Sequence, residues 1–183
     1  MQVQELAIAP VKLIVPDRFG DSRGYFSETY RDDRFGALGI GPFLQDNQSF
    51  SAARGTLRGL HCQVAPNVQG KLVRVLRGAI WDVAIDIRGG SATYGQHVAA
   101  LLSAENFAQL WVPQGFLHGF CTLEPDTEVL YKVTAPYDRA AERAVIWNDP
   151  ALALPWPIEP TEVHLSDKDR IAPSFEHARG WFG

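Results

Sequence analysis

Cysteine is scarce in this chain: only Cys62 and Cys121 occur among its 183 residues. The two lie far apart and form no Cys-x-x-Cys pair, whereas disulfide scaffolds are typical of short, cysteine-dense secreted chains. We therefore expect two reduced thiols and a cytoplasmic protein.

Long apolar runs and basic runs are also absent. No apolar stretch approaches the roughly 20 residues that cross a membrane, and residues 1–10 carry no basic segment ahead of an apolar one. We therefore expect neither a membrane span nor a signal peptide. The formal net charge is -4, and no basic run is long enough to follow a phosphate backbone. Nucleic acid is therefore not an expected partner.

What the chain does have is a series of short β patterns. Its 183 residues, 46% of them hydrophobic, suffice for one core, so we predict a single domain over residues 1–183. Residues 79–87 alternate apolar and polar side chains, the period of a half-buried strand. Further strands are predicted at residues 11–15, 26–30, 71–76, 95–102, 109–112, 116–122 and 128–134. Many short strands with Gly, Pro and Asp turns predict an all-β fold, and the jelly roll suits this count.

Helix signals are few. Residues 31–38 have helical spacing and end at Gly39, and Ser103 and Ser166 can each cap a short turn. Residues 45–49 form an unbroken polar row. Prolines at positions 150, 155, 157 and 160 predict an irregular, extended tail after residue 136.

Residues 56–63 and 70–76 place a cation, an imidazole and an amine on two neighbouring predicted strands. These groups belong to Arg58, His61 and Lys71. Inward-facing positions of such strands are normally apolar, so titratable groups there indicate a pocket inside the barrel. A His that takes a proton and a Lys that stabilises an oxyanion suit chemistry next to a carbonyl.

Arg58 and His61 are three positions apart, which points them to opposite faces of a regular strand. Gly59, between them, could permit a bulge that turns both side chains inward. A core histidine with satisfied hydrogen bonds is the alternative interpretation of His61.

Three more residues are candidates for the same pocket, and each has a structural alternative. His118 shares a strand face with Phe116 and Phe120 and is equally well explained as a packed core histidine. Tyr131 can act as a general acid, or be a core tyrosine with a bonded hydroxyl. Asp169 is by default a solvated or capping carboxylate, unless the tail folds back to orient His61.

Two histidines on barrel strands also raise the question of zinc or iron. Metal-binding cupins usually present a His-x-His pair with a Glu a few residues on. Here the strand reads His61-Cys62-Gln63, and no Glu follows nearby. We therefore expect no metal.

The whole set resembles the dTDP-4-dehydrorhamnose 3,5-epimerase family, cupin-type jelly rolls that act on nucleotide-linked 4-keto-6-deoxy sugars. The resemblance runs nearly end to end. It rests on residues 21–26, 45–47, 57–61, 69–75, 81–88, 113–120, 130–132, 146–150 and 165–169. The one departure is Cys62, where an aromatic residue is common, so its effect on the packing of His61 is open.

The resemblance implies catalytic roles for four residues. His61 matches the base, Asp169 the carboxylate that orients it, Tyr131 the acid on the opposite face of the sugar, and Lys71 the group near the C4 oxygen. Nine further positions match ligand contacts: Arg23, Glu28, Gln45, Asn47, Arg58, His118, Tyr137, Glu142 and Lys168. Tyr137 matches the aromatic that stacks on thymine.

The resemblance also implies a partner and a reaction. Family members form a homodimer that exchanges N-terminal strands, so Arg23 and Glu28 serve the partner's site. The expected reaction inverts C3 and C5 of a dTDP-linked 4-keto-6-deoxy sugar in dTDP-L-rhamnose biosynthesis. No redox cofactor is expected, because the substrate already carries the ketone.

Three alternatives stay open on the sequence. A mono-epimerase inverting only C3 or only C5 shares all of these residues. A metal-dependent cupin enzyme and a non-enzymatic sugar-binding or nucleotide-binding jelly roll are the others. Metal analysis and solvent deuterium uptake, respectively, distinguish these last two from an epimerase.

Overall fold

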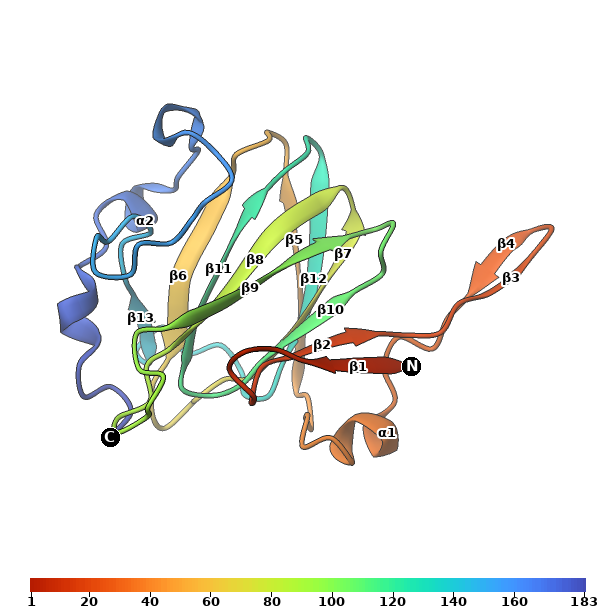
Figure 1. Cartoon of the computed structure of the whole chain (residues 1–183), viewed down its shortest axis with the longest axis horizontal. Helices are drawn as coiled ribbons and strands as arrows, with labels where there is room; N and C mark the ends of the chain where they lie inside the picture. Colours follow the sequence, from red (N-terminus) through yellow and green to blue (C-terminus); the bar gives the residue numbers. More distant parts are fainter.

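The computed structural model describes all 183 residues and shows two packed sheets of antiparallel strands (Figure 1). The predicted all-β jelly roll is confirmed. One sheet runs in the order β1 (Gln2–Glu5), β2 (Lys12–Val15), β10 (Gln109–Val112), β7 (Lys71–Arg77), β12 (Thr127–Val133), β5 (Gln45–Ser51). The other runs β13 (Glu142–Ala144), β6 (Leu57–Gln63), β11 (Phe116–Thr122), β8 (Ala79–Asp86), β9 (His97–Ser103).

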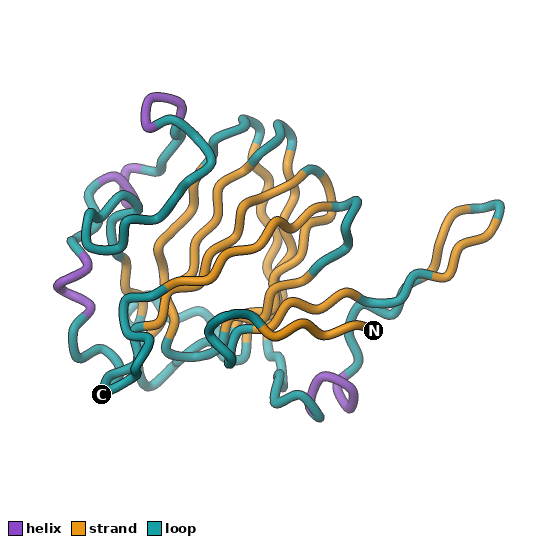
Figure 2. Tube along the Cα trace, in the orientation of Figure 1, coloured by secondary structure: helices purple, strands orange, loops and turns teal.

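Helices are short and lie outside the sheets (Figure 2). The predicted helix at residues 31–38 appears as α1 (Asp32–Gly36). The predicted cap at Ser166 is confirmed: its Oγ accepts from the backbone N–H of Asp169, at the start of α2 (Asp167–Arg170). Ser103 closes a turn with Asn106 and starts no helix. Two 3-10 helices, Pro160–Glu162 and Phe175–Ala178, complete the tail. None of the helices has the length and apolar character that a membrane crossing requires.

The main core lies between the two sheets. Val73 and Val129 of the six-stranded sheet belong to one buried cluster with Ile80 and Phe116 of the five-stranded sheet. Removing this apolar area from water is the largest stabilising contribution that the fold offers.

The expectation that β8 is half-buried is wrong. Its outward side chains, among them Val83 and Ile85, are covered by Val145 and Leu152 of the tail. The inward side chains of β8 are buried as well, including Asp82, which is 0% exposed. The irregular tail thus acts as a second layer over this sheet, which the alternation in the strand alone cannot indicate.

Two other strand predictions need correction. Residues 27–30 lie outside any strand, and the ordered pairing is upstream, in the hairpin of β3 (Phe19–Asp21) with β4 (Gly24–Phe26). The polar row at residues 45–49 belongs to the strand β5. A strand with polar inward side chains is stable here because these side chains border a cavity instead of the apolar core.

The β3–β4 hairpin projects far from the body of the molecule (Figure 1). Its aromatic side chains are mostly exposed, with Phe19 at 64%, Tyr25 at 61% and Phe26 at 69%. A pair of strands this short has marginal stability alone. Apart from the edge-to-face contact of Tyr25 with Phe107, no aromatic contact ties the hairpin to the body, so most of its aromatic surface is uncovered in the single chain.

Candidate active site

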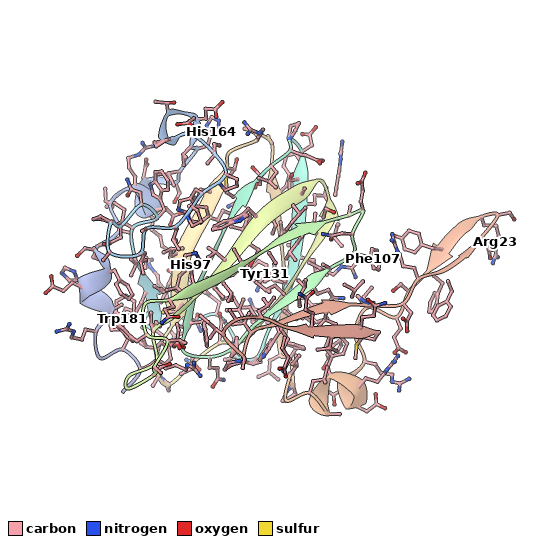
Figure 3. All side chains as sticks on the ribbon, in the orientation of Figure 1. Arg23, His97, Phe107, Tyr131, His164 and Trp181 are labelled. Atoms are coloured by element: carbon pink, nitrogen blue, oxygen red, sulfur yellow. The ribbon has the colours of Figure 1, made fainter.

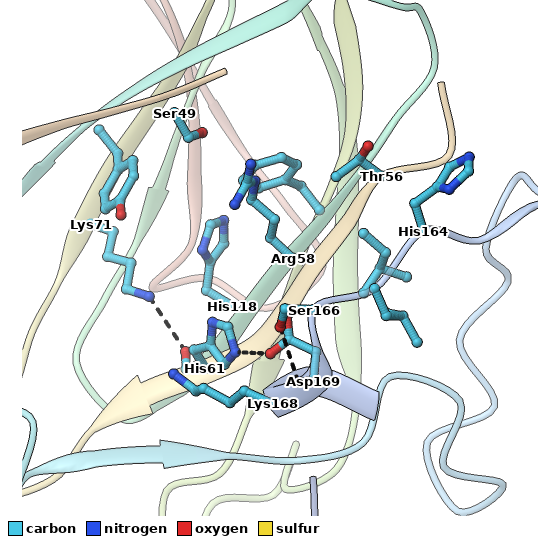
Figure 4. Close-up of a pocket in the computed structure, with 14 residues that line it drawn as sticks. Ser49, Thr56, Arg58, His61, Lys71, His118, His164, Ser166, Lys168 and Asp169 are labelled. Carbon is cyan, nitrogen blue, oxygen red and sulfur yellow. Dashed lines mark hydrogen bonds and ion pairs between the residues drawn. The ribbon is translucent and has the colours of Figure 1, made fainter. Parts of the chain in front are cut away.

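Side chains from both sheets and from the tail surround a cavity of about 470 Å³ (Figure 4). The structure brings together here seven residues that the sequence analysis proposed: Arg58, His61, Lys71, His118, Tyr131, Lys168 and Asp169. They come from β6, β7, β11, β12 and α2, so residues over 100 positions apart in the chain meet in one site.

His61 and Asp169 form a hydrogen-bonded pair, with 2.6 Å between Nε2 and Oδ1. Strand β6 holds the imidazole, and the capped first turn of α2 holds the carboxylate, which is 4% exposed. Burial acts to raise the pKa of Asp169, but the hydrogen bond and charge of His61, together with Ser166 and Lys168, lower it overall. An ionised Asp169 accepts a hydrogen bond from Nε2–H of His61, which leaves Nδ1 of the neutral imidazole free to act as a base.

Lys71 stands at the start of β7 and lines the same cavity. Its Nζ donates to the backbone oxygen of His61 over 3.4 Å. Burial lowers the pKa of Lys71. An ammonium in a shielded cavity interacts strongly with a developing oxyanion, because little water screens it.

A bulge in β6 allows the side chains of Arg58 and His61 to point into the same cavity. The pairing of β6 with β11 shifts register between His118 and Phe120, opposite Gly59. Gly59 has a φ of 133°, and a Cβ there would lie 2.6 Å from the Cα of Gly119. Only glycine fits this backbone and this close approach. The predicted bulge is thus confirmed, and Arg58 and His61 line the same cavity.

His118 is held by a residue that the sequence analysis missed. Its Nε2 lies 3.0 Å from Oδ2 of Asp82, and both side chains are buried. Burial lowers the pKa of His118, while the charge of Asp82 opposes that shift. The signal was present in the sequence, as an acidic residue on the inward side of a largely apolar strand.

Tyr131 faces His61 across the cavity, since β12 belongs to one sheet and β6 to the other. Burial raises the pKa of Tyr131. The phenol therefore keeps its proton at neutral pH and can donate it. A base on one wall and a proton donor on the opposite wall are the arrangement that inverts a carbon held between them.

A second cavity of about 240 Å³ adjoins the first and shares His61, Lys71 and Tyr131 with it. Four more of the proposed residues line it: Gln45, Asn47, Tyr137 and Glu142. Tyr137 is 55% exposed, so its ring is free to stack on a flat ligand.

Glu142 joins these residues into one network. It accepts hydrogen bonds from Tyr137 and Lys168. Burial acts to raise the pKa of Glu142, but Lys168, with smaller contributions from His61 and Tyr137, lowers it overall. Glu142 therefore stays ionised and keeps Lys168 at the rim that joins the two cavities.

Arg23 and Glu28 lie outside both cavities. The Arg23 side chain is 88% exposed at the tip of the hairpin, where it pairs with Asp21 and is far from Tyr131 (Figure 3). Glu28 pairs with Arg31 and Arg34 on the surface. Within one chain, neither side chain belongs to the site.

Cys62 does not crowd His61. It is 5% exposed and packs in the cluster beneath the tail with Leu60 and Val83. Burial raises the pKa of its thiol to about 12. Cys62 is therefore a protonated packing residue that also borders the smaller cavity, and both Cys62 and Cys121 are free thiols.

No cluster of three or more His, Cys, Asp or Glu side chains has an arrangement that could hold a metal ion. The two histidines of the cavity each pair with a carboxylate instead, His61 with Asp169 and His118 with Asp82. The absence of a metal from the reaction stays a prediction.

Comparison with known proteins finds relatives over nearly the whole chain. The model of the dTDP-4-dehydrorhamnose 3,5-epimerase family matches residues 5–177. A dTDP-4-dehydrorhamnose 3,5-epimerase of Sinorhizobium fredii is 56% identical over 176 residues, which cover 95% of this chain and 89% of that protein.

Two solved structures share the fold. A dTDP-6-deoxy-D-glucose-3,5-epimerase from Legionella pneumophila, in complex with dTDP-4-keto-L-rhamnose, superposes with a TM-score of 0.90 at 44% identity, covering 94% of this chain and 92% of that one. A 3'-monoepimerase from Streptomyces bikiniensis, in complex with dTDP-quinovose, has a TM-score of 0.86 at 34% identity, covering 93% and 86%. By sequence and fold, this chain belongs to the dTDP-4-dehydrorhamnose 3,5-epimerase family.

Proposed function

We propose that this chain is an isomerase that inverts C3 and C5 of dTDP-4-dehydro-6-deoxy-D-glucose and so forms dTDP-4-dehydro-L-rhamnose, in dTDP-L-rhamnose biosynthesis. One observation carries the proposal: the His61–Asp169 pair and Tyr131 face each other across a cavity that also holds Lys71. The names of the relatives, and the dTDP-4-keto-L-rhamnose bound to one of them, support the choice of substrate.

The first half of each inversion is removal of a proton. Nδ1 of His61 takes the proton from the carbon next to the C4 ketone, and the C–H electrons form a carbon–carbon double bond. The carbonyl electrons move onto O4, where Lys71 stabilises the negative charge. Asp169 stabilises the imidazolium that results.

The second half returns a proton to the other face. The Tyr131 hydroxyl donates its proton to the carbon, the ketone re-forms, and the configuration is inverted. The tyrosinate then regains a proton from solvent, and His61 loses the one that it took. The same pair serves C3 and C5 in turn, because both carbons flank the ketone.

The larger cavity and the smaller one beside it together suit the nucleotide. Arg58 and Lys168 offer cations for the diphosphate, and Tyr137 offers an exposed ring for thymine. Gln45, Asn47 and Glu142 supply polar contacts between these two ends.

Conversion of the purified substrate tests the proposed function. We expect the wild-type protein to give a sugar with the L-rhamno configuration, identified by the proton coupling constants around the ring. A product inverted at a single carbon would make the chain a mono-epimerase, which is the second candidate because the Streptomyces bikiniensis mono-epimerase shares the fold. The double inversion is favoured by the higher identity, 56%, to a 3,5-epimerase.

We also propose that two copies assemble by exchanging the N-terminal arm. The exposed aromatic side chains of the β3–β4 hairpin and the distance of Arg23 from its own cavity support this. In such a dimer, Arg23 and Glu28 complete the partner's site. The free thiols further support a cytoplasmic location.

Mixing two inactive variants tests the exchange of arms. Arg23→Ala and His61→Asn homodimers should each be impaired. A mixed dimer then contains one intact site, because the chain that retains His61 receives Arg23 from its partner. After co-refolding in equal amounts, about half of the dimers are mixed and half of their sites work, so roughly a quarter of wild-type activity should return. No recovery would show that Arg23 acts on its own chain.

Removal of metal should leave the activity unchanged. Incubation with a chelator, followed by dialysis, is expected to keep the rate of epimerisation within about twofold, because the imidazole–carboxylate pair supplies the base without a Lewis acid. Measurement of turnover before and after treatment checks this. A loss that a divalent ion restores would contradict it.

A further inference from the structure

Strand β5 presents a row of polar side chains to the interior. Burial alternates along Gln45–Ser51, so that Gln45, Asn47 and Ser49 are half-buried, Ser51 is buried, and the residues between them are exposed. Inward positions of such a strand are normally apolar. Each inward polar group therefore needs a hydrogen-bond partner or a ligand.

One of these groups has no partner. Gln45 donates to Asn47 over 2.7 Å, and Ser51 accepts from Arg58 over 3.3 Å. The Ser49 hydroxyl oxygen is shielded from solvent and has no hydrogen-bond partner. It is the single buried side-chain nitrogen or oxygen of the chain that lacks one. Buried polar atoms without partners are rare in folded proteins. The hydrogen-bond partner of this hydroxyl is therefore expected to be a bound ligand.

Ser49 belongs to the wall of the larger cavity, with Lys71 and Tyr131 (Figure 4). In the β5–β12 register, Ser49 is opposite Val129, and Asn47 is opposite Tyr131. Ser49 is thus one diagonal step from Tyr131 on the same face. No hydrogen bond fixes its rotamer, so the hydroxyl can turn about χ1 toward a ligand without losing a hydrogen bond.

We propose that Ser49 binds the C2 hydroxyl of the sugar ring, an inference that rests on the proposed function. A serine hydroxyl both donates and accepts, so it pairs well with another hydroxyl. The C3 hydroxyl changes direction during the reaction, and C4 carries the ketone. The C2 hydroxyl keeps its configuration through both inversions, so a contact there holds the ring in place while His61 and Tyr131 act.

The test compares Ser49→Ala with the wild type on two substrates: the 4-keto nucleotide sugar and its analogue without the C2 hydroxyl. On the full substrate, kcat/KM should fall by about 10- to 100-fold, the discrimination typical of a lost buried hydrogen bond. On the 2-deoxy analogue, Ser49→Ala and the wild type should agree within about twofold. The unfolding temperature of Ser49→Ala should not fall, because the free protein loses no hydrogen bond.

Gln48→Ala is the matched control, since Gln48 is the next residue of β5 and its side chain points outward to Glu128. It should leave kcat/KM for both substrates unchanged. Equal losses by Ser49→Ala on both substrates would overturn the inference, as would full activity on the natural one. A wild-type protein that turns over neither sugar would overturn the proposed function, and the role of Ser49 with it.

Discussion

The His61→Asn variant should lose exchange and inversion together, by on the order of 10⁴-fold, the upper end of what a positioned base contributes. Asparagine keeps a polar side chain of similar reach but cannot take a proton. The loss is expected at both C3 and C5, because both carbons use Nδ1 of the same imidazole. Solvent deuterium uptake and product formation, followed by NMR, measure the two effects separately.

Nucleotide binding should survive this substitution. The diphosphate and thymine contacts proposed above involve Arg58, Lys168 and Tyr137 and not His61, so the affinity for dTDP should change by less than about threefold. His164→Asn is the matched control, because His164 also lines the cavity but has no carboxylate partner. Substantial turnover by His61→Asn, or an equal loss in His164→Asn, would contradict the assignment of the base.

The Tyr131→Phe variant should separate the two halves of the reaction. The ring and its packing remain, and only the proton donor is lost. His61 can still form the enolate and return a deuteron to the face it left, so wash-in from solvent should continue. Inverted product should fall by on the order of 10²–10⁴-fold.

Tyr137→Phe serves as the control for a lost phenol, since the Tyr137 hydroxyl bonds Glu142 and its ring is exposed. It should weaken binding without changing the ratio of wash-in to inversion. Inversion at the normal rate in Tyr131→Phe would make Tyr131 a core tyrosine. Loss of deuterium wash-in as complete as in His61→Asn would show that Tyr131 is also needed for proton removal, and not only for proton return.

Much of the fold could be predicted because strand periods and turn residues are local signals. The strands of residues 71–76, 109–112, 116–122 and 128–134 appear close to the predicted bounds. The burial of β8 on both faces could not be predicted, because the tail that covers Val83 lies over 60 positions away in the chain.

In the site, too, local sequence features could be predicted and features set by distant contacts could not. A bulge at Gly59 was predictable, because Arg58 and His61 cannot otherwise share a cavity. Asp82 was missed, because its part in the site depends on a hydrogen bond to His118 on the neighbouring strand. The proposed role of Ser49 rests on a buried hydroxyl without a hydrogen-bond partner, and no sequence pattern indicates such a group.

The central claim is that one cavity removes and returns protons at both carbons next to the ketone. Incubation of wild-type protein with dTDP-4-dehydro-6-deoxy-D-glucose in D2O, followed by NMR of the product, tests it most directly. The predicted product has the L-rhamno configuration and carries deuterium at both C3 and C5. Deuterium at one carbon alone, or an inverted product without deuterium, would contradict the claim.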